Sequence, residues 1–86
     1  MRKIYKYKLP VDGGVVAIDD YIVKILDLQA QDGVPTMWAI VDSEIEAAGP
    51  IEIIAIGTGW ELPAGIDEYL GTVQDEYGSV WHYFLI

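Results

Sequence analysis

The feature that most constrains this chain is a series of short runs in which apolar and polar residues alternate, each interrupted by Gly, Pro or Asp. Alternation with period two is typical of β-strands, and no stretch of eleven residues keeps the 3.6-residue period of a helix. We therefore expect an all-β fold in one domain, residues 1–86, built as a small sandwich or a partly open barrel of about seven short, mainly antiparallel strands. The predicted strands are 4–9, 15–18, 22–31, 36–42, 51–57, 69–74 and 80–86.

Turn residues separate these strands. Asp32-Gly33 lies between two β-rich runs, which is a strong hairpin signal, so strand 22–31 is predicted to pair antiparallel with strand 36–42. Asp12-Gly13 supplies a tight turn before residue 15. The spacing of Ser43 and Glu46 is that of a capping box, so residues 43–46 form either a single helical turn or a plain loop.

Three predicted strands, 36–42, 51–57 and 80–86, are apolar on both faces. In a two-layer protein of this size the outer face of each sheet meets water, so such strands need a cover. We expect a homo-oligomer whose interface supplies it; the alternatives are tight barrel curvature or a covering loop at residues 60–67. The predicted core residues are Trp38, Ile40, Ile54, Ile56, Val73, Trp81 and Phe84.

The net charge is −9, from fourteen acidic and five basic residues. Four of the basic residues lie within the first eight positions, so Lys24 alone stands against all fourteen acidic residues in the rest of the chain. A chain of this charge repels phosphate backbones, which argues against direct nucleic-acid binding. Its surface is either an ordinary solvated acidic shell or a face for a basic partner.

The chain has no Cys, so it contains neither disulfides nor thiolate sites. The basic N-terminus is followed by no apolar stretch typical of a signal peptide, and no 18-residue apolar run exists. These features predict a soluble cytoplasmic protein that does not contact membranes.

No motif in the chain predicts an enzyme, a cofactor or a metal. Gly57-Thr58-Gly59 lacks the Gly-Lys-Ser/Thr of a phosphate loop and is interpreted as a strand-ending turn. His82 is the only histidine and lies within an apolar strand, where a hydrogen-bonded structural role is expected. The acidic pairs fall at predicted turns and lack calcium-loop spacing. We therefore predict no catalytic, cofactor-binding or metal-binding residues.

The aromatic residues are the remaining binding candidates, because such rings dominate interaction hot spots. Trp38 and Trp81 lie within strands and are expected in the core, whereas Trp60 lies in a loop and is expected to be partly exposed. The predicted partner-contact residues are Trp60, Glu61, Asp67 and Glu68.

These observations predict a non-enzymatic acidic protein that acts through protein–protein contact with a basic-surfaced factor. Two alternatives remain open. The protein could present its carboxylates as phosphate surrogates in a counter-defence role. Alternatively, subunits could enclose a small nucleotide, provided that Lys3, Lys6, Lys8 and Lys24 converge across an interface.

A set of short motifs spans nearly the whole chain in order. They are Tyr5-Lys6-Tyr7, Ile25-Leu26, Gln31-Asp32-Gly33-Val34-Pro35, Trp38-Ala39, Val41-Asp42, Gly57-Thr58-Gly59, Gly71-Thr72 and Trp81-His82. In these motifs the chain resembles a family of short bacterial and bacteriophage-carried proteins of unknown function. The resemblance implies a phage or prophage setting, with the protein in the host cytoplasm and a host factor as its partner, and it implies no catalytic residue.

Overall fold

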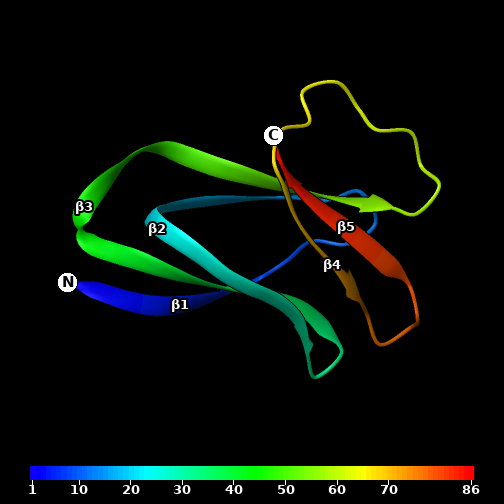
Figure 1. Cartoon of the computed structure of the whole chain (residues 1–86), viewed down its shortest axis with the longest axis horizontal. Coiled ribbons are helices and arrows are strands. Elements are labelled where there is room, and N and C mark those ends of the chain that lie inside the picture. Colours follow the sequence, from blue (N-terminus) through cyan, green and yellow to red (C-terminus); the bar gives the residue numbers. More distant parts are fainter.

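The computed structural model describes residues 1–86 and contains five β-strands. The strands are β1 (Arg2–Lys8), β2 (Val15–Gln31), β3 (Val34–Gly57), β4 (Tyr69–Gln74) and β5 (Val80–Leu85). All pairings are antiparallel, in the order β1-β3-β5-β4, with β2 paired along β3. The long β2–β3 ribbon bends, and the sheet curls into a half-barrel in which β2 approaches β4 (Figure 1). The structure holds no helix that could span a membrane.

The all-β prediction is confirmed, but the count of about seven strands is wrong. β2 joins the predicted strands 15–18 and 22–31, and β3 joins 36–42 and 51–57. The polar residues that suggested breaks, 19–21 and 43–46, are exposed at the bend of a two-stranded ribbon. Water reaches these side chains there, so a run of polar residues does not end the strand.

The predicted helical turn or loop at residues 43–46 is also wrong, because this segment is extended within β3. Ser43 donates from both its amide and its hydroxyl to the carbonyl of Met1, at 3.1 and 3.2 Å. The N-terminal ammonium in turn lies 3.2 Å from Asp42 and 3.0 Å from Glu44. These contacts and the pairing of Glu46 with Asp20 of β2 keep the segment extended, and they use the Ser43 amide that Glu46 would accept from in a capping box.

Bulges in β2 change which side chains face the core. The register against β3 shifts four times between Ile18 and Asp27. As a result Ile22, Ile25 and Leu28 pack against the core, whereas Leu26 is 42% exposed. Strict alternation along 22–31 places Leu26 inside, so the sequence pattern alone misassigns it.

The predicted hairpin at Asp32-Gly33 is confirmed, with Gln31 paired to Val34 across a two-residue loop. Asp32 and Gly33 have φ values of 52° and 79°, the two positive angles of a type I′ turn. The predicted turn at Asp12 is confirmed as well, with φ of 54° there and a 2.9 Å hydrogen bond from the Gly14 amide to the Val11 carbonyl.

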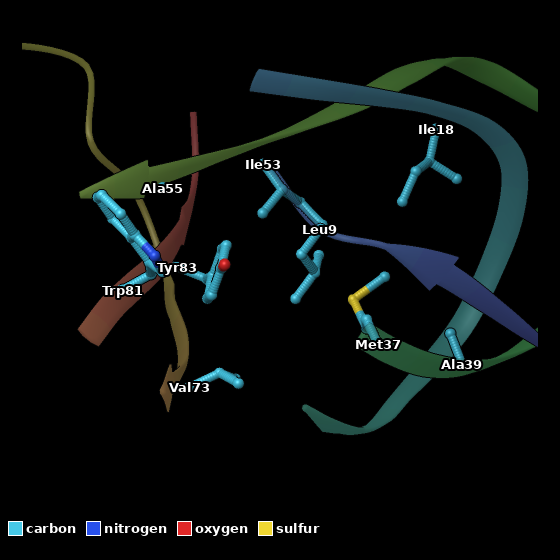
Figure 2. Packing of buried hydrophobic residues seen from close by; sticks show 9 residues of the cluster. All are labelled: Leu9, Ile18, Met37, Ala39, Ile53, Ala55, Val73, Trp81 and Tyr83. Carbon is cyan, nitrogen blue, oxygen red and sulfur yellow. The ribbon is translucent and has the colours of Figure 1, made fainter. Parts of the chain in front are cut away.

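The core lies on the inner side of the curled sheet, and it is small, with 14 of 86 residues buried. Its cluster consists of Leu9, Ile18, Met37, Ala39, Ile53, Ala55, Val73, Trp81 and Tyr83, whose side chains gather between the two halves of the sheet (Figure 2). The predicted core residues Ile56, Val73 and Trp81 are buried. The other four, Trp38, Ile40, Ile54 and Phe84, are only half-buried.

The error has a simple geometric cause. Residues 37, 39, 41, 53 and 55 of β3 face inward, so residues of the opposite parity face outward. Since both parities are apolar in β3 and β5, the sequence does not reveal which face of the strand is the inner one.

Candidate functional site

Four tight turns gather at one end of the half-barrel: residues 11–14, 31–34, 57–60 and 75–79, called here the turn end. The amide of Glu76 donates to the carbonyl of Gly33 at 3.0 Å, which joins the tips of the two hairpins. The indole of Trp60 lies against both Gly13 and Gly57. Turns far apart in the sequence therefore lie on the same side of the molecule and contact one another (Figure 1).

A pocket of about 310 Å³ opens in this surface. Its buried lining residues are Leu9, Pro35 and Trp81. Its polar lining includes the carboxylates of Asp12, Asp75 and Glu76, and Tyr77 beside them is 84% exposed. We call these seven residues the acidic pocket. It combines an apolar base with clustered negative charge and a free aromatic ring.

Asp75 organises the acidic pocket. One carboxylate oxygen accepts from the backbone amides of Tyr77 and Ser79, each at 3.0 Å, and the other accepts from the indole Nε1 of Trp81 at 2.9 Å. The hydrogen bond from Trp81 is the largest cause that lowers the pKa of Asp75, and the two amides add to it. Asp75 therefore stays ionised to lower pH than a free aspartate while it holds the indole in place.

The negative charge of the acidic pocket has no internal counterion. The only ion pairs in the chain join the N-terminal ammonium to Asp42 and Glu44, at the opposite side of the ribbon. None of the five basic side chains pairs with a carboxylate. The field of Asp12, Asp75 and Glu76 is therefore directed to solvent or to a partner.

The structure separates the four predicted contact residues into two places. Trp60, 49% exposed, lies at the turn end with its ring edge-on to Trp81 at 5.5 Å, and Glu61 follows it. Asp67 and Glu68 instead hydrogen-bond with the backbone of Leu85 near the other end of β5. Leu85 lies four residues along β5 from Trp81, about 13 Å at the usual rise per residue. The four residues thus form two groups rather than one cluster.

Sequence reasoning missed Asp12, Asp75, Glu76 and Tyr77. Each lies in a predicted turn, where a solvated acidic residue is ordinary. Only the pairing of the strands brings these turns together, and no local signal in the sequence reports that.

His82 belongs to a chain of hydrogen-bonded side chains on β4, β5 and the turn that follows β3. Its Nε2 lies 2.7 Å from the hydroxyl of Thr58, and its Nδ1 lies 3.0 Å from that of Thr72, which in turn contacts the hydroxyl of Tyr69 at 2.6 Å. Both ring nitrogens are thus engaged by hydroxyls, which fixes the ring orientation. Gly57–Trp60 is a turn, as predicted, closed by a 3.1 Å hydrogen bond between the Trp60 amide and the Gly57 carbonyl.

The outer face of the first half of the sheet carries most of the positive charge. Lys6 is paired with Trp38, while Lys24 and Ile4 flank Ile40, so these side chains share one face. Lys6 and Lys8 line a pocket of about 400 Å³ near the β2–β3 tip, where the Lys6 ammonium donates to Gln31 at 2.8 Å. Lys3, paired with Val41, belongs to the opposite face. We call Arg2, Lys6, Lys8 and Lys24 with Trp38 the basic face.

Comparison with known proteins gives one result. No curated protein and no solved structure matches the chain. A model of a domain of unknown function, DUF7352, matches residues 1–85. The match covers every strand described above. The chain is therefore a member of the DUF7352 family.

Proposed function

We propose that this protein is a non-enzymatic binding protein that acts through protein–protein contact, and that the acidic pocket receives a lysine or arginine side chain of its partner. The observation that carries the proposal is the combination of a buried apolar base with the carboxylates of Asp12, Asp75 and Glu76, which have no counterion in the chain. This combination suits a side chain with an apolar stem and a cationic head.

The chemistry of recognition follows from the lining. The methylene stem of the incoming side chain would lie along Leu9 and Trp81, and its charged head would meet the carboxylates. The ring of Tyr77, free of other packing, offers its face to the same cation. Burial of the stem supplies affinity, whereas the charges supply orientation and a fast encounter.

The partner that we propose is a basic-surfaced host factor. Support for the host setting comes from the resemblance to phage-carried proteins, and support for the basic surface comes from the charge of the pocket. In the counter-defence alternative, the host factor binds nucleic acid through a basic groove, and this protein occupies that groove in place of the nucleic acid. Competition between the protein and a short DNA duplex for the isolated factor would distinguish the two roles.

The test uses short peptides as probes and amide and indole NMR shifts as the measurement. A lysine- and arginine-containing peptide is expected to shift Trp81 Nε1 and the amides of residues 75–79, and added salt should weaken binding. Asp12→Asn and Glu76→Gln should each reduce affinity severalfold. Glu46→Gln, a matched change at the exposed bend, should leave affinity unchanged. Equal shifts at all acidic residues, or affinity unaffected by the pocket variants, would refute the proposal.

A second candidate function rests on the basic face. Lys6 and Lys8 line one pocket, and Trp38 stands beside Lys6, so a phosphate and a planar base would find a cation and a ring close together. This arrangement supports a form of the nucleotide alternative that uses Lys6 and Lys8 of one chain, without Lys3, which belongs to the opposite face. A panel of nucleotides is expected to raise the melting temperature of the protein but not of a Lys6→Glu, Lys8→Glu variant. Melting temperatures that stay flat across the panel would eliminate this candidate.

A further inference from the structure

The open side of the half-barrel is a groove between β2 and β4. Each of these strands pairs with a single neighbour, β2 with β3 and β4 with β5, so their other edges face each other without pairing. The groove between them measures about 440 Å³. Its lining residues are Ile22, Val23, Lys24, Ile25, Ile51, Glu68, Tyr69, Leu70 and Leu85, and we call it the seam.

The seam is an uncovered side of the hydrophobic core. Ile22, Ile25, Ile51, Leu70 and Leu85 all pack against the buried cluster, yet each remains partly exposed through the seam. Apolar side chains that are continuous with a core and open to water are expected at an interaction surface.

The shape of the seam argues for a broad cover rather than an inserted strand. At one end Leu28 bridges the walls, since a Cβ atom on Gly71 would lie 3.2 Å from the Leu28 Cδ2 atom. A strand threaded between β2 and β4 needs the two to stand about 9.5 Å apart along its whole length, twice the usual strand spacing. Because Leu28 fills that space, an occupant must lie across the seam from outside.

The charges at the seam indicate which surface lies across it. Lys24 lies on β2 and Glu68 lies directly before β4, so they stand on opposite walls of the seam, and neither makes an ion pair within the chain. A two-fold axis over the seam would bring Lys24 of each copy towards Glu68 of the partner subunit, so that two reciprocal pairs form. We propose that a second copy of this chain covers the seam in an isologous dimer, with the apolar walls of the two seams packed against each other.

Light scattering after gel filtration of the full chain tests this proposal. The wild type is expected at twice the 9.6 kDa mass of the chain. Lys24→Glu and Glu68→Lys each place like charges face to face twice per dimer, so each should weaken the dimer by about tenfold or more. The double variant with both substitutions restores the pairing with reversed signs, and it should recover the dimer.

Matched variants separate the seam from net charge. Lys8→Glu and Glu61→Lys make the same changes of charge at exposed positions outside the seam, and they should remain dimeric. Circular dichroism of every variant checks that the sheet is intact. A wild type that elutes as a 9.6 kDa particle would overturn the proposal. A double variant that stays monomeric while folded, or control variants that dissociate as readily as the seam variants, would overturn it too.

Discussion

Gly57 allows the indole of Trp60 to seat on the backbone of β3. A Cβ atom added at residue 57 would lie 2.6 Å from Cε2 and 2.7 Å from Nε1 of that indole, closer than any real contact allows. The backbone of Gly57 is paired with Trp81 and cannot move easily. We therefore predict that Gly57→Ala expels the Trp60 ring from its seat rather than distorting the strand.

The size of the effect follows from what Trp60 loses. The side chain is 49% exposed, so about half of its surface is covered. A tryptophan buries up to about 250 Å², and about 100 Å² of this would be released, worth roughly 2.5 kcal/mol at about 25 cal/mol per Å². Loss of the edge-to-face contact with Trp81 adds about 0.5 to 1.5 kcal/mol. Because the ring can regain some contact elsewhere, we expect Gly57→Ala to destabilise the protein by about 2 kcal/mol.

A double-mutant cycle read by urea unfolding measures this coupling. Gly57→Ala should cost about 2 kcal/mol in the wild type but close to nothing in a Trp60→Ala background, where no ring is left to displace. Tryptophan fluorescence should shift to the red in the single variant as the indole enters water. The reasoning fails if Gly57→Ala costs the same in both backgrounds, or if it leaves stability and fluorescence unchanged.

Three further changes test other parts of the structure. Tyr83→Phe removes a 2.7 Å hydrogen bond from a buried side chain and should cost about 1 to 2 kcal/mol in thermal unfolding. Burial raises the pKa of Tyr83 above 10.0, so the folded state keeps the phenol proton to higher pH than the unfolded chain does. The contribution of this group to the free energy of unfolding is therefore complete below pH 10 and is lost as the pH rises. Tyr83→Phe lacks the ionisable group, so it should lose less stability than the wild type in an alkaline titration. The pKa of Asp75 is lowered in the folded state, so its contribution to the free energy of unfolding is present above about pH 4 and is lost as the pH falls. Acid unfolding, followed by near-UV circular dichroism, should therefore depend less steeply on pH in Asp75→Asn than in the wild type. Residue 33 has a φ of 79°, and a Cβ atom there would lie 2.5 Å from the Glu76 Cβ atom. Gly33→Ala should therefore lower the free energy of unfolding in urea by more than about 1 kcal/mol. Gly49→Ala, which has open space around it, should lower it little.

Local signals predicted the parts of the fold that local physics decides. The type I′ hairpin at Asp32-Gly33 follows from two residues that tolerate positive φ, and the structure has it where the sequence indicates. The joining of 36–42 and 51–57 into one strand is not a local matter. β3 continues through this segment because it stays paired with β2 at Asp20 and Glu46, because Met1 bonds to Ser43, and because the polar residues of the bend stay in water.

The candidate site was harder to predict than the fold, for a related reason. Asp12 and Asp75 belong to turns about sixty residues apart, and each by itself is an ordinary turn aspartate. They become one site because β1 and β5 both pair with β3, which carries the two turns to the same end. Only the partial exposure of Trp60 was predicted correctly, because its place in a loop between Gly59 and Glu61 is a local signal.

The expectation of an oligomer came from the strands that are apolar on both faces. The structure moves the surface that needs a cover from the outer face of β3 to the seam. On the outer face of β3, Trp38 and Ile40 stand directly beside Lys6 and Lys24, whose long methylene stems give partial cover without a second subunit. At the seam, on β2 and β4, core side chains lack such cover, because bulges and a missing neighbour strand leave them open. We therefore base the proposed dimer on the incomplete closure of the barrel rather than on the two-sided strands.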